Sequence, residues 1–245
     1  MYPVLGKLLG QLIYSYPLFI GISWGISYYF SQFLFKKVGR TLRGFSYVYW
    51  GTFLISWVGA KIFFLLFSAK SILLYKHVSF WTGGGFVFYG GLAFGLLYLF
   101  LISVIFKKFD SRSLVLFLPP LALSHAVGRL GCFLAGCCFG KVSEVPWAIH
   151  MHGDFRHPAQ LYESLGLFLL SFILYKNLIS NASSTKMINI YFVCYSLIRF
   201  LVEFFRGDIV RGQYFNFSTS QIISVIILML ITSINILKKK NNYAV

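Results

Sequence analysis

Several ionisable side chains lie inside segments of this sequence that are otherwise apolar. Arg199 and Glu203 are four residues apart, and Arg206 would follow on the same stripe of a helix. His125 and Arg129 have the same four-residue spacing in an earlier apolar segment. A charged group at membrane depth is costly unless it is paired or hydrated. Each of these residues therefore needs either a partner or a function.

Arginine at such positions points to a bound anion. Arg129 has no acidic residue in its own segment, so it must meet Glu163, Glu203 or an anion. Guanidinium groups are suited to bidentate contact with phosphate, and a phospholipid headgroup is the phosphate that a membrane supplies. The structural alternative for Arg199 and Glu203 is an ion pair within one helix that neutralises itself.

Two glycine-rich stretches accompany these charged residues. One is TGGGFVFYGGLAFG (Thr82–Gly95), and the other is GRLGCFLAGCCFG (Gly128–Gly140), which begins beside Arg129. Glycine lets a backbone approach a ligand or another helix closely. We favour a ligand cradle next to a buried arginine. Close packing between helices through small residues is the alternative.

Cysteine and histidine give weaker signals. Four cysteines lie in or beside apolar segments, namely Cys132, Cys137, Cys138 and Cys194. A disulfide framework is not expected there, and two adjacent cysteines are by default packing residues, with a reactive thiol as the alternative. Three histidines follow in a polar segment, namely His150, His152 and His157. Together with the cysteines they lack a standard ligand spacing, so we expect no metal site.

The elements that position these residues are membrane-spanning helices. The composition is 58% hydrophobic and only 11% charged, whereas a soluble domain carries roughly a quarter charged residues. Seven runs approach the ~20 apolar residues that cross a bilayer: 16–35, 45–68, 85–106, 113–135, 160–180, 187–205 and 219–237. We therefore expect an all-α integral membrane protein, a bundle of about seven transmembrane helices in a single domain over residues 1–245.

The formal net charge of +16 does not indicate a nucleic-acid partner, because the basic residues gather at the ends of apolar runs. That placement is typical of topology signals and of contacts with anionic lipid. Alternate connections carry twelve Lys and Arg residues, and the opposite connections carry seven. This bias predicts an N-terminus outside the cell and a cytoplasmic C-terminus.

Two segments do not read as spans. Residues 1–15 carry a single Lys7 and resemble no cleavable signal peptide. We expect them to lie on the membrane as an amphipathic segment. Residues 136–159 contain Pro146, Asp154 and Arg156 and are too polar to span. We expect this segment to form an arm on the outer, extracytoplasmic face.

Four ordered motifs resemble those of the prolipoprotein diacylglyceryl transferase family. VGRLGCFLAGCCFG is similar to the family signature G-R-x-G-N-F-x-N-G-E-x-x-G, and RHPAQLYESL is close to R-H-P-S-Q-L-Y-E. IRFLVEFFRGD is nearly the family's R-F-x-V-E-F-F-R, and FYGGLAFG is similar to H-G-G-L-x-G. The resemblance extends over nearly the whole chain from about Tyr16.

The resemblance implies an activity. Family members transfer diacylglyceryl from phosphatidylglycerol to the lipobox cysteine of a prolipoprotein in the bacterial inner (plasma) membrane, without a metal or diffusible cofactor. It assigns catalytic roles to Arg129, Arg199, Glu203 and Tyr89. It assigns substrate-binding roles to Arg129, Gly90, Gly91, Gly140, Tyr162, Glu163, Cys137 and Arg206, with Tyr89 and a turn at Gly90–Gly91 closing over the reacting glyceryl carbon.

The sequence departs from the family pattern at a few positions. Tyr89 stands where the family has histidine, and Cys137 stands where it has glutamate. Cys132 and Ala135 replace two asparagines. These changes leave two alternatives open. One is a divergent paralogue that transfers a lipid to another acceptor, and the other is a non-catalytic phospholipid-binding membrane protein.

Overall fold

The computed structural model describes residues 1–8, 10–40, 44–67, 88–106, 111–207, 213–214 and 217–242. The chain forms two compact units. The first combines Met1–Ser27 with Val115–Val245, and the second is Tyr28–Leu114. That the chain is a single transmembrane domain stays a prediction.

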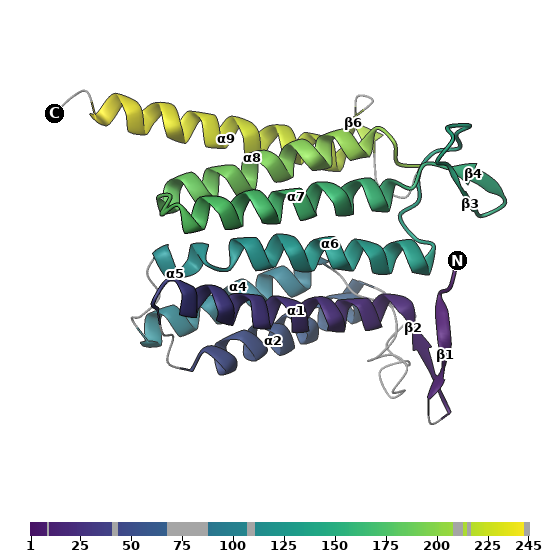
Figure 1. Ribbon diagram of the computed structural model, residues 1–245, viewed down its shortest axis with the longest axis horizontal. Helices are drawn as coiled ribbons and strands as arrows, with labels where there is room; N and C mark the ends of the chain where they lie inside the picture. The colour runs from purple at the N-terminus through teal and green to yellow at the C-terminus, as the bar shows by residue number, and fades with distance from the viewer. Residues whose placement is uncertain are drawn as a thin grey trace. The chain divides into compact units, whose positions relative to one another are not determined.

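Helices dominate both units (Figure 1). The long ones are α1 (Ser15–Lys37), α2 (Phe45–Phe67), α4 (Phe88–Phe106), α6 (Leu118–Ala135), α7 (Ala159–Ile179), α8 (Ser184–Glu203) and α9 (Thr219–Asn242). Within the described residues, six helices are long and apolar enough to cross a membrane. In the remaining one, α4, a shorter apolar helix covers Ala93–Ile102. The all-α membrane fold is confirmed, and the chain is a multi-pass membrane protein.

The fourth predicted run is divided in the structure. A short helix, α5 (Ser111–Val115), precedes α6, and Pro119 and Pro120 follow the first residue of α6. Proline fits the first turn of a helix but cannot continue one from the preceding residues, because it lacks an N–H group. The two prolines therefore explain the break.

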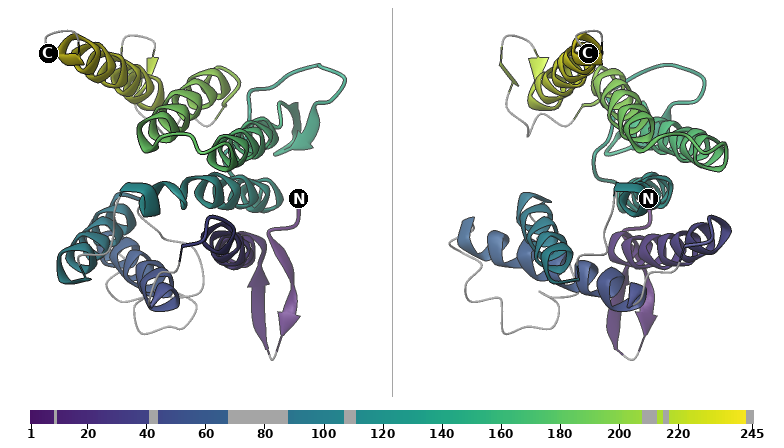
Figure 2. Two further views of the ribbon diagram at one scale, coloured as in Figure 1. Left: turned by 60° about the vertical axis from the view of Figure 1, so that its left-hand side comes forward. Right: turned by 90° about the vertical axis from the view of Figure 1, so that its left-hand side faces the viewer.

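In the first unit, α6, α7, α8 and α9 pack in sequence order, each against the next (Figure 2). Leu167, Leu170 and Leu174 of α7 are buried. Buried serines bond to the neighbouring helix, and the Ser164 hydroxyl donates to the Ala126 carbonyl at 2.9 Å. The outer faces stay apolar; Leu165, for example, is 62% exposed. Such faces suit lipid as the solvent.

In the second unit, α2 and α4 pack closely through glycines. A Cβ atom on Gly59 would lie 2.7 Å from the Gly90 carbonyl oxygen, and one on Gly91 would lie 3.0 Å from the Ser56 carbonyl oxygen. Gly90 and Gly91 both lie in helix α4. The predicted turn at these two residues is therefore wrong. Small residues serve helix packing here. The first part of that glycine-rich stretch, 82–87, lies outside the described residues.

Short hairpins occupy the connections. Strands β1 (Val4–Leu8) and β2 (Gln11–Tyr14) pair near the N-terminus, β3 (Ile149–Met151) pairs with β4 (Asp154–Arg156), and β5 (Gln213–Tyr214) pairs with β6 (Phe217–Ser218). The β3–β4 hairpin extends from the end of the first unit where α6 ends and α7 begins (Figure 1). Residues 136–159 therefore form a non-helical arm, and its outward orientation stays a prediction, as does the interfacial position of residues 1–15.

Candidate active site

The carboxylate of Glu163 lies between two arginines. Arg129 Nη2 of α6 lies 2.9 Å from Glu163 Oε1, and Arg199 Nη1 of α8 donates a hydrogen bond to Glu163 Oε2 at 2.9 Å. The Glu163 side chain is only 2% exposed. One buried carboxylate on α7 therefore fixes two guanidinium groups that come from the helices on either side of it.

Arg199 has further partners. Its Nη2 donates to Glu203 Oε2 at 2.8 Å, across one turn of α8, and to the Ser220 hydroxyl of α9 at 3.0 Å. Arg199 and Glu203 thus form the ion pair that their four-residue spacing indicated, and their catalytic roles stay predictions. The pair is part of a wider network, because four consecutive helices of the first unit, α6 to α9, each supply at least one of its members. A self-neutralising pair within one helix does not describe it.

The network carries more positive than negative charge. Arg206, which is 6% exposed, lies close enough to interact electrostatically with Glu163. Three guanidinium groups thus surround two carboxylates. Among the described residues, the buried Nε of Arg129 has no hydrogen-bond partner, and an unsatisfied buried donor is costly. Excess positive charge and an open donor together suit an anionic oxygen.

Backbone contacts at Gly140 tie the arm to the end of α8. The Gly140 amide donates to the His157 carbonyl at 3.1 Å, and the Lys141 amide donates to the Phe205 carbonyl at 2.8 Å. A Cβ atom on Gly140 would overlap the His157 carbonyl and lie 2.8 Å from the Phe205 oxygen. Gly140 also forms a bridge with Arg206. Only glycine permits this crossing, which holds Arg206 at the network.

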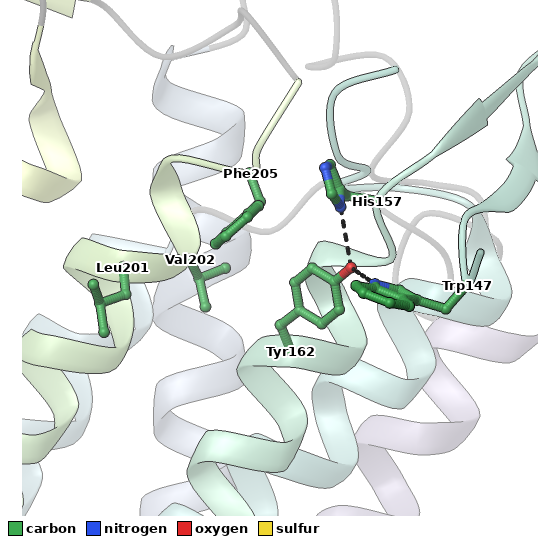
Figure 3. A pocket seen from close by; sticks show the side chains of 6 residues that line it. All are labelled: Trp147, His157, Tyr162, Leu201, Val202 and Phe205. Carbon is green, nitrogen blue, oxygen red and sulfur yellow. Dashed lines mark hydrogen bonds between the residues drawn. The ribbon is translucent and has the colours of Figure 1, made fainter. Parts of the chain in front are cut away.

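Tyr162 lines a neighbouring pocket together with Trp147 and His157 (Figure 3). Its hydroxyl accepts a hydrogen bond from Trp147 Nε1 at 2.7 Å and lies 3.1 Å from His157 Nδ1. The pocket has a volume of about 410 Å³ and is lined by Trp147, His157, Tyr162, Leu201, Val202 and Phe205. Two of its lining residues are sequence neighbours of the network, because Tyr162 precedes Glu163 on α7 and Val202 precedes Glu203 on α8. An apolar pocket therefore adjoins the charged network.

Most of the predicted site residues lie in the first unit. Its network contains Arg129, Glu163, Arg199, Glu203 and Arg206, with Gly140 as a support. Tyr89, Gly90 and Gly91 belong to the second unit, and the Tyr89 side chain lies outside the described residues. The thiol of Cys137 is exposed and lies 3.6 Å from the Cys132 carbonyl oxygen.

Sequence reasoning missed two polar partners. Ser220 carries no signal in the sequence, because one serine at the start of an apolar run is ordinary. Trp147 is conspicuous in the polar arm, yet only the fold brings its indole to Tyr162. His125 lies 3.9 Å from Glu163 Oε1, and its spacing from Arg129 did mark it.

The fold and the site define a multi-pass membrane protein with a buried arginine–carboxylate network. The family model for prolipoprotein diacylglyceryl transferase matches residues 3–237. This chain therefore belongs to the prolipoprotein diacylglyceryl transferase family.

Curated relatives agree with this assignment. A phosphatidylglycerol–prolipoprotein diacylglyceryl transferase 2 from Clostridium perfringens is 37% identical, with 96% of each chain covered. A phosphatidylglycerol–prolipoprotein diacylglyceryl transferase from Clostridium tetani is 34% identical over 69% of this chain and 70% of its own. One from Campylobacter hominis is 30% identical over 98% and 92%.

Proposed function

We propose that this chain transfers diacylglyceryl from phosphatidylglycerol to the lipobox cysteine of a prolipoprotein in the bacterial inner membrane. The observation that carries the proposal is the buried network in which Glu163 holds Arg129 and Arg199 in a member of this transferase family. An N-terminus outside and a C-terminus in the cytoplasm place the arm and the network near the outer face, where a secreted prolipoprotein arrives.

Arg129 binds the phosphate of the phospholipid. Its Nε is the open donor of the network, and the excess positive charge favours a phosphodiester at this place. Arg199, oriented by Glu203, and Arg206 add to the positive potential. The phosphate gains negative charge as it leaves. Fixed guanidinium groups therefore stabilise the transition state more than the bound substrate, which lowers the barrier.

The reaction replaces a C–O bond of the glyceryl carbon by a C–S bond. The thiol sulfur of the acceptor forms a C–S bond, the C–O bond to the phosphate breaks, and glycerol phosphate leaves with the electron pair. The thiol proton passes to a base. The acceptor supplies the attacking thiol. Gly140 and Cys137 line the headgroup end, and no metal or cofactor takes part. The roles of Tyr89, Gly90 and Gly91 rest on the family resemblance alone.

The pocket beside Tyr162 receives hydrocarbon. Its lining is mainly apolar, and the polar atoms of its rim, Trp147 Nε1, His157 Nδ1 and the Tyr162 hydroxyl, are engaged with one another. An acyl chain of the donor would fill this volume without leaving a polar group unsatisfied. The adjoining charged network then holds the headgroup of the same molecule.

Mass spectrometry tests the proposal. The purified full chain is incubated with phosphatidylglycerol vesicles and a synthetic lipobox peptide, and a second peptide with serine in place of the cysteine serves as the control. We expect a diacylglyceryl mass on the cysteine peptide alone. Lipid binding without any adduct would overturn the proposal in favour of a non-catalytic lipid-binding protein or a paralogue with another acceptor.

A further inference from the structure

Three thiols gather at the end of α6, next to the headgroup network. Among the residues that the structure describes, Cys132, Cys137 and Cys138 place their Sγ atoms within 4.8 Å of one another. All three are free cysteines. We propose that they form a binding site for a thiophilic metal ion, Zn²⁺ or Cu⁺, a site that the transfer reaction does not require.

The spacing of the sulfur atoms suits such an ion. A metal–sulfur bond of about 2.3 Å places tetrahedral or trigonal thiolates roughly 4 Å apart. Shifts of less than about 1 Å would therefore bring all three sulfur atoms to one ion. Soft thiolate ligands select Zn²⁺ and Cu⁺ over hard cations such as Mg²⁺. Three protein ligands leave a fourth position open on Zn²⁺, whereas three thiolates suit Cu⁺.

The backbone turns the thiols toward one another. Helix α6 ends at Gly136, whose φ is 74°, and the Cys137 amide donates to the Cys132 carbonyl at 3.1 Å. Cys138 has a φ of 59°, a left-handed conformation that is unfavourable for a residue other than glycine. This turn reverses the chain, so residues 132, 137 and 138 meet although no standard ligand spacing links them.

Charges around the cluster favour thiolates. Arg129 Nη1 lies 4.0 Å from Cys132 Sγ, and Arg206 also acts electrostatically on Cys138. On binding Zn²⁺, the three thiols release three protons and leave a complex with one negative charge. The adjacent guanidinium groups offset that charge.

The nearby histidines have other partners. His152 Nε2 lies 2.7 Å from the Gly136 carbonyl oxygen, and His157 Nδ1 lies 3.1 Å from the Tyr162 hydroxyl. The fold therefore does not bring the arm histidines into the cysteine cluster. The donor set consists of three thiols, which distinguishes this site from a mixed cysteine–histidine zinc site.

Metal binding by the full-length protein tests the proposal directly. The reduced, chelator-treated protein in detergent is dialysed against Zn²⁺, or against Cu⁺ without oxygen, and bound metal is measured by elemental analysis. We expect one equivalent per chain from at least one of the two ions. Co²⁺ serves as an optical probe, because thiolate–cobalt charge transfer reports the number of sulfur ligands.

Single variants locate the ion. Cys194 lies in α8, apart from the cluster, so Cys194→Ser is the matched control and should retain the full equivalent. Cys137→Ser changes an exposed side chain and should fold normally. Removing a residue that only hydrogen-bonds to a metal ligand already weakens metal affinity by about 10–100-fold, so removing the ligand Cys137 itself should weaken it by more than about 100-fold. The proposal would be overturned if the wild-type chain bound less than half an equivalent of Zn²⁺ and also less than half an equivalent of Cu⁺. Unchanged metal binding in Cys137→Ser and Cys138→Ser would overturn it as well.

Discussion

Replacing Glu163 by glutamine should destabilise the protein strongly. The change removes the charge that Arg129 and Arg199 share at 2.9 Å each, while keeping the size of the side chain. Removing one partner of a buried ion pair costs about 3–5 kcal/mol. A chain of this length loses roughly 2–4 °C of Tm per kcal/mol. The Glu163→Gln variant should therefore unfold about 6–20 °C below the wild type.

The assay is thermal unfolding in a neutral detergent, first without and then with phosphatidylglycerol. The lipid should raise the Tm of Glu163→Gln more than that of the wild type, because its phosphate replaces the missing negative charge and stabilises the folded state by binding it. Glu144 is exposed in the arm, and Glu144→Gln, the matched control, should change stability by less than about 0.5 kcal/mol. A Tm for Glu163→Gln within 2 °C of the wild type would refute this reasoning.

Three further predictions follow from the same contacts. Gly140→Ala should disrupt the junction between the arm and α8, because its Cβ would meet backbone atoms. Gly21→Ala in α1 has open space and should unfold at or slightly above the wild-type temperature, since alanine favours a helix more than glycine does. Tyr162→Phe should slow transfer by about tenfold or less while leaving headgroup binding unchanged, as measured with short-chain phosphatidylglycerol. In the metal-free protein, neighbouring thiols lower the pKa of Cys138 and raise that of Cys137. The rate of alkylation at Cys138 should therefore stay high, and the rate at Cys137 should stay low, as the pH falls from about 8.5 to about 6.5. Peptide mass spectrometry measures both rates, and the same dependence of the rate on pH at the two cysteines would contradict this prediction.

The helices were largely predictable because a bilayer fixes their length. The predicted run 45–68 corresponds to α2 (Phe45–Phe67), and the run 160–180 corresponds to α7 (Ala159–Ile179). The division before α6 was missed, although Pro119 and Pro120 are visible in the sequence. The run is apolar throughout, so hydropathy alone does not register the loss of backbone hydrogen bonds.

The members of the charged network were predictable, but the pairing between them was not. An arginine inside an apolar run needs a partner, which marked Arg129 and Arg199. Three partners for Arg129 remained open, since the choice depends on which helices become neighbours. The glycine pair at Gly90–Gly91 illustrates the opposite case. The same residue type serves a turn or a helix contact, and only the neighbouring helix distinguishes them.

The cysteine cluster could not be predicted from spacing. Cys132 lies in the last turn of α6, and Cys137 and Cys138 follow the helix. Their approach depends on two residues in left-handed conformations, Gly136 and Cys138. Glycine at a helix end is a familiar signal, whereas a cysteine with positive φ has none in the sequence.

The central claim is that Arg129, held by Glu163, binds the phosphate of the donor lipid. Its most direct test is the transfer rate of Arg129→Ala, measured as lipid-modified lipobox peptide, against that of Lys141→Ala. Lys141 is an exposed cation beside Gly140, so its variant removes an equal charge without touching the network. Loss of one fixed donor to developing charge costs about 10²–10³-fold. We predict a loss of at least about 100-fold for Arg129→Ala and less than about threefold for Lys141→Ala. Near wild-type transfer by a folded Arg129→Ala protein would contradict the account.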